Sequence, residues 1–322
     1  MIKFLIDCDP GVDDSIALMY AFEKKDVEVV GIATSFGNVS ARQGADNALR
    51  LLKFCGKEGQ IPVCVGAEEP LVGEHEEYPA FIHGKNGFGN INLEPSDQKP
   101  VDMDVCDFLY EKACEHEGEL VLLTLGRLTN IALTLQKYPD FAKKIKRVVI
   151  MGGCLGPYGN VGPCMDANIG GDPEAADIAL CADWFVTMVG MDVTNYVVLH
   201  MNDVRMAKEY ARPECKKYLQ FMEDELQHYM KGVRLQNWRR NCTPTHDPLA
   251  IMVAVNPSLV KTQKRITRIE LEGKYTRGMV VTDMREYPIE GNFVEHCLEV
   301  DCERALNELF AVFQDPLSAA FE

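Results

Sequence analysis

The chain has 322 residues, a hydrophobic content of 47% and a formal net charge of −16 at pH 7. This length and composition predict one large domain covering residues 1–322. The acidic balance argues against nucleic acid or an anionic membrane as a partner, because both carry negative charge, and it is compatible with a small neutral substrate.

The first predicted element is a short apolar strand at residues 3–6, followed by the segment DCDPGVDD. This segment places four carboxylates within eight residues: Asp7, Asp9, Asp13 and Asp14. Four anions so close repel one another unless a cation lies among them, and a hard divalent ion accepts oxygen ligands. Capping of the next helix explains Asp13 and Asp14, but it does not explain Asp7 and Asp9. We therefore predict a metal site at the carboxyl end of this strand, where open α/β sheets bind ligands.

Strand-like and helix-like segments alternate along the rest of the chain. Strands are predicted at 27–34, 62–65, 120–125, 147–151 and 185–189, and helices at 40–54, 101–116, 130–137 and 173–180. Further along, we predict one long amphipathic helix, two late strands and a final helix at 202–237, 265–271, 278–282 and 301–313. Apolar runs separated by helices predict an α/β fold with a single large open Rossmann-like sheet, mostly parallel and flanked by helices.

Polar side chains gather where several of these strands end. The segments are TSFGNV (34–39), HGKNGFGN (83–90), LGRLTN (125–130), the glycine-rich 152–173 and THDPLA (245–250). Each is a weak indication alone, because turn asparagines usually bond to their own backbone, loop histidines are commonly surface residues, and an aspartate before a helix is usually a cap. The glycine-rich stretch lacks the P-loop pattern, and no dinucleotide fingerprint follows the first strand.

The twelve cysteines include no C-x-x-C pair, so zinc-ribbon and redox motifs have no support. We expect them to be small buried hydrophobes in a reducing compartment. The N-terminus lacks the pattern of a secretory signal, and no stretch approaches the length of a transmembrane span. A cytoplasmic location is therefore expected.

Together, these motifs resemble those of the inosine–uridine type nucleoside hydrolases. The matching segments are DCDPGVDD, TNIAL, MGG followed by GN and N-x-x-x-DPEAA, HDPLA and TRGMVVTD, in the family's order across residues 5–283. The resemblance implies calcium-dependent hydrolysis of the N-glycosidic bond of ribonucleosides, which releases ribose and a free base for purine or pyrimidine salvage. It also implies a homodimer or homotetramer.

The resemblance further implies a role for individual residues. Calcium would be bound by three carboxylates and one backbone carbonyl, those of Asp9, Asp14, Asp247 and Leu125. Asp9 would also be the general base, and His246 would assist the departing base, with His83 a weaker candidate. The substrate would be contacted by Asp13, Asn38, Met151, Asn160, Asp166 and Asn168. The 2′ and 3′ hydroxyls of a ribose can complete the shell of a calcium ion, which takes oxygen ligands.

One segment departs from the family pattern. Many relatives read E-F-N where this chain reads Asp166, Ala167 and Asn168, so a side chain is shorter and an aromatic ring is lost. Two alternatives stay open: a nucleoside-binding protein of this fold with altered or lost activity, and a metal-dependent phosphohydrolase of the haloacid-dehalogenase type, which also begins with D-x-D after a strand. The retained Asp9 and Asp247 argue against the first, and the lack of a matching lysine motif argues against the second.

Overall fold

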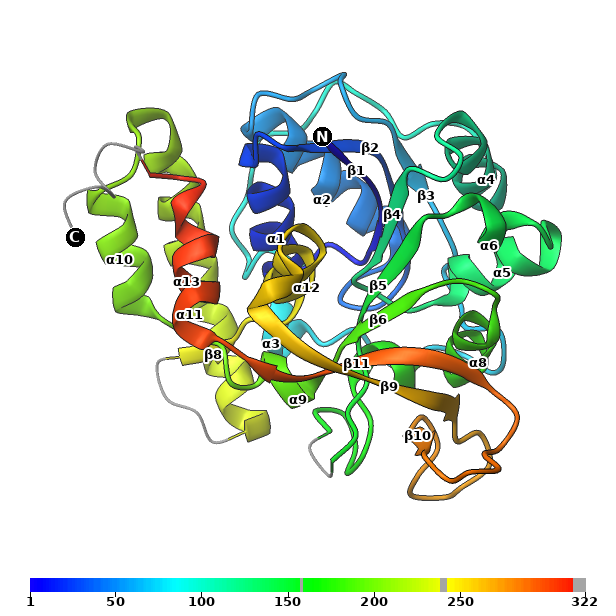
Figure 1. Ribbon diagram of the computed structural model, residues 1–322. Helices are drawn as coiled ribbons and strands as arrows, with labels where there is room; N and C mark the ends of the chain where they lie inside the picture. Colours follow the sequence, from blue (N-terminus) through cyan, green and yellow to red (C-terminus); the bar gives the residue numbers. More distant parts are fainter. Residues whose placement is uncertain (157–158, 238–241, 315–322) are drawn as a thin grey trace.

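A computed structural model describes residues 1–156, 159–237 and 242–314. Its centre is a nine-stranded sheet with the order β10-β9-β11-β6-β5-β4-β1-β2-β3 (Figure 1). The strands are β1 (Ile2–Cys8), β2 (Val27–Thr34), β3 (Val63–Val65), β4 (Leu120–Thr124), β5 (Arg147–Met151), β6 (Val186–Val189), β9 (Val260–Ile269), β10 (Val280–Asp283) and β11 (Asn292–Val300). Neighbouring strands are parallel except where β9 pairs with β10 and β11. The predicted α/β fold with a mostly parallel sheet is confirmed.

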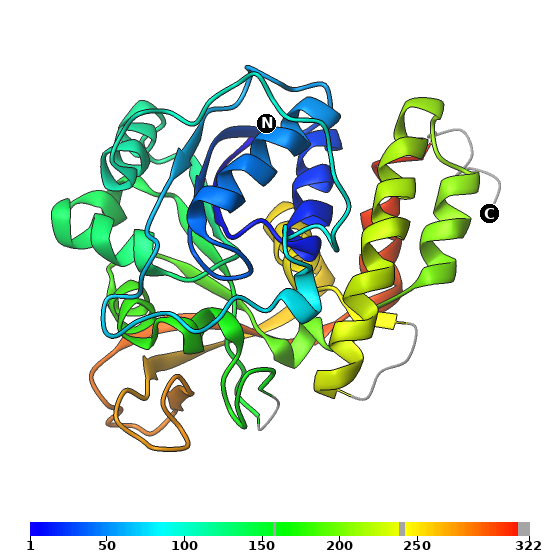
Figure 2. The same cartoon turned by 180° about the vertical axis from the view of Figure 1, so that it is seen from behind.

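Helices cover both faces of the sheet, as the two opposite views show (Figures 1 and 2). One face carries α1 (Val12–Glu23), α2 (Ala41–Phe54) and α12 (His246–Val255), and the other carries α4 (Val105–Glu115), α5 (Thr129–Lys137), α6 (Phe141–Lys144) and α8 (Pro173–Cys181). Alternating residues of β1 supply the two cores, because successive side chains of a strand point to opposite faces. Phe4 and Ile6 belong to the core under α1, whereas Leu5 belongs to the core under α4.

A second group of helices lies beyond α1 and α12. It contains α10 (Met201–Glu209), α11 (Lys216–Asn237) and α13 (Cys302–Ala311). The smaller elements are α3 (Ala80–His83), α7 (Ala167–Gly171), α9 (Met191–Thr194), the pair β7 (Val198–His200) and β8 (Cys242–Pro244), η1 (Pro213–Cys215) and η2 (Pro257–Leu259). Within the described residues, no helix combines the length and apolarity needed to cross a membrane.

The structure differs from the sequence predictions most clearly in three respects. The single helix at 202–237 is broken, because Arg212 precedes a proline and takes an extended ψ of 143°. The central strand β11 was not predicted, because Glu295, His296 and Glu299 interrupt its apolar pattern. The expectation of buried cysteines fails at Cys114 and Cys181, which are exposed.

The parallel strands bring the polar loops together. In a parallel sheet, the carboxyl ends of β1, β2, β4, β5 and β6 meet at one edge. Four of the segments predicted to carry the chemistry follow β1, β2, β4 and β5 directly, whereas HGKNGFGN follows α3 and THDPLA follows β8. The fold therefore gathers at one edge segments that lie more than a hundred residues apart in the chain.

Candidate active site

A cavity of about 980 Å³ lies at this edge of the sheet. That volume is near the upper end of the range for small-molecule sites, roughly 300–1,000 Å³. The cavity is lined by nearly all the candidate residues from the sequence: Asp9, Asp13, Asn38, His83, Leu125, Met151, Asn160, Asp166, Asn168, His246 and Asp247. The remaining candidate, Asp14, is completely buried beside them.

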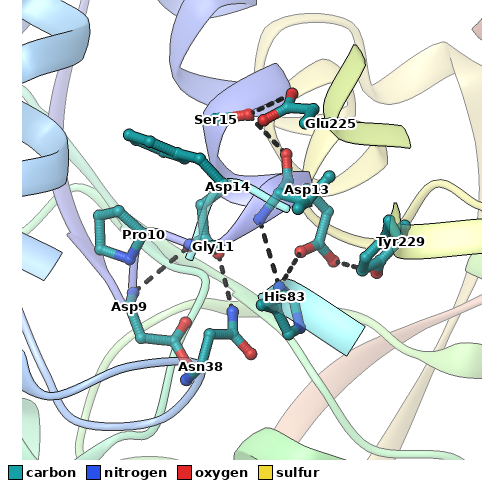
Figure 3. A network of polar contacts seen from close by, with 12 residues as sticks. Asp9, Pro10, Gly11, Asp13, Asp14, Ser15, Asn38, His83, Glu225 and Tyr229 are labelled. Carbon is teal, nitrogen blue, oxygen red and sulfur yellow. Dashed lines mark hydrogen bonds and ion pairs between the residues drawn. The ribbon is translucent and has the colours of Figure 1, made fainter. Parts of the chain in front are cut away.

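The turn between β1 and α1 positions the first carboxylates (Figure 3). Gly11 allows the segment that carries His83 to approach closely, because a Cβ at this position would collide with Nδ1 of His83. The Asp14 carboxylate caps α1 by accepting hydrogen bonds from the backbone N–H of Gly11 at 2.9 Å and of Asp9 at 3.3 Å. The helix start therefore fixes Asp14 just behind Asp9.

Asp13, Asp14 and Asp247 form a buried acidic group, in which one oxygen from each residue lies within 4.8 Å of the others. Burial and mutual repulsion raise the pKa of Asp14 to about 7 and raise the pKa of Asp247 well above its usual value. Asp9 adjoins the group, and burial together with the charge of Asp14 raises its pKa as well. Oδ1 of Asp9 and Oδ1 of Asp13 are buried without a hydrogen-bond partner among the described residues, although Oδ1 of Asp13 lies 3.9 Å from Nδ1 of His83. A hard divalent cation fits this donor set, because it would bind the unpartnered oxygens and relieve the repulsion.

Asp7 does not share this group, which corrects the interpretation of four carboxylates around one cation. Its Oδ2 accepts a hydrogen bond of 2.7 Å from Nδ2 of Asn130, and burial raises the pKa of Asp7 to about 8. Asp7 still belongs to β1, whereas Asp9 lies beyond the end of that strand. The spacing of two residues therefore does not place both side chains on one side.

Two asparagines hold the metal-ligand candidates in place. Asn38 donates from its backbone N–H to Oδ2 of Asp9 at 2.8 Å and from Nδ2 to Oδ2 of Asp14 at 3.0 Å. Asn168 donates from Nδ2 to the carbonyl oxygens of Leu125 at 2.7 Å and Met151 at 3.0 Å. A carbonyl oxygen has two lone pairs, so the Leu125 carbonyl keeps one for a further partner.

Asp166 and Asn160, two further residues expected to contact the sugar, differ in how many of their side-chain oxygens already accept hydrogen bonds. The Asp166 carboxylate caps α7, where it accepts from the backbone N–H of Gly153 at 2.8 Å and of Ile169 at 3.1 Å. Asn160 has its backbone N–H bonded to the carbonyl of Met165, while its Oδ1 is buried without a partner among the described residues. Asn160 is therefore the more available of the two for a ligand.

The structure distinguishes the two histidines. His83 ends α3 and is buried, so its expected position on a mobile glycine-rich loop is wrong. The backbone N–H of Val12 donates to Nδ1 of His83 at 3.2 Å, which leaves the ring proton on Nε2. Burial and the charge of His228 lower the pKa of His83 to about 3, so the ring is neutral. His246 begins α12, and its Nδ1 lies 2.8 Å from Oγ1 of Thr194.

Among the residues of the cavity wall that sequence reasoning missed are Tyr229 and Arg127. Tyr229 of α11 donates its hydroxyl to Oδ2 of Asp13 at 3.1 Å and lies 5.2 Å from the ring of His83 (Figure 3). An aromatic residue in an amphipathic helix looks like a core residue, so no pattern singled it out. Arg127 also lines the cavity, with its guanidinium 4.4 Å from the ring centroid of Phe36. A cation directly after an apolar strand was the indication that could have identified Arg127.

Comparisons with known proteins agree with this geometry. A family model described as inosine-uridine preferring nucleoside hydrolase matches residues 4–307. Uridine nucleosidase 1 of Arabidopsis thaliana is 36% identical over 277 residues, which cover 84% of this chain and 79% of that protein. The pyrimidine-specific ribonucleoside hydrolase RihA of Escherichia coli is 32% identical over 94% of both chains. The structure of a purine-preferring ribonucleoside hydrolase from Gardnerella vaginalis is similar, with a TM-score of 0.89, 33% identity, and coverage of 97% of this chain and 98% of that one.

Proposed function

The chain belongs to the inosine-uridine preferring nucleoside hydrolase family and hydrolyses ribonucleosides, and we propose that it does so with bound calcium, Asp9 as general base and His246 as proton donor to the leaving base. The observation that carries the proposal is the buried Asp13–Asp14–Asp247 group beside the unpartnered Oδ1 of Asp9 in the cavity wall. Relatives are named for uridine, pyrimidine and purine substrates, so uridine and inosine are the first to assay for ribose release.

The residues that would hold the cation are Asp9, Asp14, Asp247 and, through its carbonyl, Leu125. Asp13 lies beside them and completes the buried acidic group with Asp14 and Asp247. When bound, a hard divalent cation anchors vicinal hydroxyls and offsets the negative charge of its ligands. That positive charge also lowers the raised pKa of Asp9, which keeps its carboxylate ionised and able to accept a proton.

We expect the purified protein to contain about one calcium ion per chain, because all the candidate ligands are oxygen atoms. Removal of calcium with a chelator should abolish ribose release and lower the melting temperature, since an ion at a hundred times its Kd stabilises the folded state by about 2.7 kcal/mol. Metal analysis and thermal unfolding with and without chelator check this. In Asp14→Asn, the chelator should no longer change the melting temperature, because a ligand is lost. The matched control Asp7→Asn should keep the chelator effect. Stoichiometric zinc on cysteine ligands would refute the proposal.

The residues around the sugar suit the charge that develops during hydrolysis. As the C1′–N bond breaks, positive charge builds on the sugar, and carboxylate and amide oxygens stabilise it. Asp9 takes a proton from the water whose oxygen bonds to C1′. One carboxylate oxygen of Asp9, Oδ2, is held in place by the backbone N–H of Asn38, which leaves Oδ1 for the water. His246 gives a proton to the departing base. The neutral His83, whose Nδ1 accepts from Val12, is less suited to that role.

His246→Ala should reduce hydrolysis of natural nucleosides about 10²-fold, the usual contribution of a positioned acid. The same variant should spare p-nitrophenyl riboside, because its leaving group departs as a stable anion without a proton. Measuring both rates on one protein checks the role. If His246 only packs against the sugar or the start of α12, both substrates lose activity equally. His83→Ala serves as the comparison and should show no such difference between the two substrates.

The alternative of a nucleoside-binding protein without turnover, motivated by Asp166 and Ala167, is disfavoured because the matched relatives are named nucleosidases and ribonucleoside hydrolases. It predicts that nucleosides bind in the presence of calcium and that no ribose appears even after long incubation. Assembly as a homodimer or homotetramer, and a cytoplasmic role in purine and pyrimidine salvage, stay predictions of the family resemblance.

A further inference from the structure

Arg127 is held in the cavity wall in a defined orientation. It lies two residues after the Leu125 carbonyl, and its guanidinium is 4.4 Å from the ring centroid of Phe36. It also packs against Gly171, where a Cβ would overlap its Nε. Contacts with an aromatic ring and with a glycine backbone restrict the orientation of a planar cation, so its N–H groups are already positioned for a ligand.

This guanidinium has no acceptor among the described residues. It makes no hydrogen bond or ion pair with them, and its Nη1 is buried without a partner. Of the acids near it, Asp172 accepts from Oγ1 of Thr129 at 2.6 Å and from the backbone N–H of Leu71 at 2.9 Å, and Oδ2 of Asp9 accepts from Asn38. Oδ1 of Asp9 and the carboxylate of Glu76 are also near, but neither forms a hydrogen bond or ion pair with Arg127. Buried donors in folded proteins nearly always have an acceptor, so Arg127 calls for one from outside the described chain.

The position of Arg127 relates it to one part of the substrate. His83, Tyr229 and His246 come from α3, α11 and α12, on the α1 side of the sheet, whereas Arg127 precedes α5 on the opposite side. In a ribofuranose, C1′ and C4′ lie on opposite sides of the 2′,3′-diol. If the diol binds at the acidic group and the base lies toward the histidines, C5′ points toward Arg127.

The cavity has room for a substituent on C5′. Its wall on this side is formed by small or compact residues, Ala167, Gly170, Gly171 and Pro173, and the total volume is about 980 Å³. Glu74 and Glu76 also line the cavity, from the segment before α3. Recognition of an anion here therefore depends on the directed N–H groups of Arg127 and not on a general positive field.

We propose that Arg127 forms a subsite for an anionic group on the 5′ carbon, so that the enzyme accepts ribonucleoside 5′-monophosphates as well as nucleosides. This proposal rests on the proposed function, because it uses the same placement of the diol. The reaction balances without a further reactant. The oxygen of water bonds to C1′ as the C1′–N bond breaks, the base takes a proton, and the products are ribose 5-phosphate and the free base.

The test compares a nucleoside, uridine or inosine, with its own 5′-monophosphate, using the calcium-loaded enzyme and detection of the free base. We expect the wild type to hydrolyse the monophosphate with a kcat/KM within about tenfold of that for the nucleoside. In Arg127→Met, the ratio of kcat/KM for monophosphate to that for nucleoside should fall roughly 30-fold or more, because a charge-assisted contact is lost. Arg127→Lys should recover part of that loss, since it restores the charge without the planar fork.

Arg277→Met is the matched control. Arg277 lines the same cavity but already pairs with Glu174 at 2.8 Å and bonds to the carbonyl of Leu271, so its loss should change the ratio by less than about threefold. If the enzyme hydrolyses the nucleoside but is neither active on nor competitively inhibited by the monophosphate, the subsite is refuted and the proposed function stands. If no nucleoside is hydrolysed, thermal stabilisation by the monophosphate still decides the subsite: it supports the subsite when Arg127→Met removes it and refutes the subsite when it is absent.

Discussion

Replacement of Asp9 by asparagine is expected to lower turnover on uridine or inosine about 10³-fold. The substitution keeps the volume of the side chain but removes its basicity, and positioned general bases contribute typically 10²–10⁴-fold. Oδ1 of Asp9 faces no partner among the described residues, while Oδ2 is held by the backbone N–H of Asn38. One oxygen is therefore fixed and the other is available to a water molecule, which is the arrangement a general base requires.

The measurement must separate the loss of the general base from the loss of a metal ligand, because Asp9 is proposed to be both. Calcium content and melting temperature of Asp9→Asn, taken together with its kcat, show whether the variant still binds the ion. Asp7→Asn is the matched control, because Asp7 is a buried carboxyl only two residues away, in β1, that bonds to Asn130 and lies outside the acidic group. Near-normal turnover in Asp9→Asn would remove Asp9 from the mechanism. A loss as large in Asp7→Asn would show that the effect comes from disturbing β1.

Much of the fold could be predicted because the chain obeys local rules. The strand at 27–34 and the strand at 147–151 are mostly apolar, with Glu28 and Arg147 near their starts, and the structure has the same limits for both. The predicted helix at 202–237 failed because the segment contains Pro213, and the residue before a proline favours an extended backbone. Strand β11 was missed because its charged and polar residues hide the apolar pattern expected of a strand inside a sheet. Only its pairing with β6 and β9 identifies it as a strand.

The site was predictable where its residues share a short segment. Asp9, Asp13 and Asp14 are concentrated in one turn, and their repulsion in itself indicates a cation. Tyr229 could not be found in this way, because its contact with Asp13 crosses more than two hundred residues of sequence. The exclusion of Asp7 likewise depends on its contact with Asn130, from a helix start that no local pattern connects to β1. Long-range hydrogen bonds of this kind are visible only in the folded chain.

The sugar provides the second large effect. Uridine and inosine should be hydrolysed at least ~10³-fold more efficiently, in kcat/KM, than their 2′-deoxy analogues, because sites built to bind a hydroxyl discriminate by about 10⁴–10⁵ against its absence. The buried oxygens of Asp13 and the neighbouring Asp14 and Asp247 would otherwise lose a partner that they cannot replace with solvent. Parallel assays of each nucleoside, its 2′-deoxy form and its 5′-deoxy form check this, and the 5′-deoxy form should lose far less activity, since it keeps the diol.

In Asp13→Asn, the ratio of kcat/KM between the nucleoside and its 2′-deoxy form should become smaller. Tyr229 can still donate to the new amide oxygen, but the negative charge beside the diol is gone. Comparable rates on inosine and 2′-deoxyinosine in the wild type would mean that the diol does not bind at the acidic group.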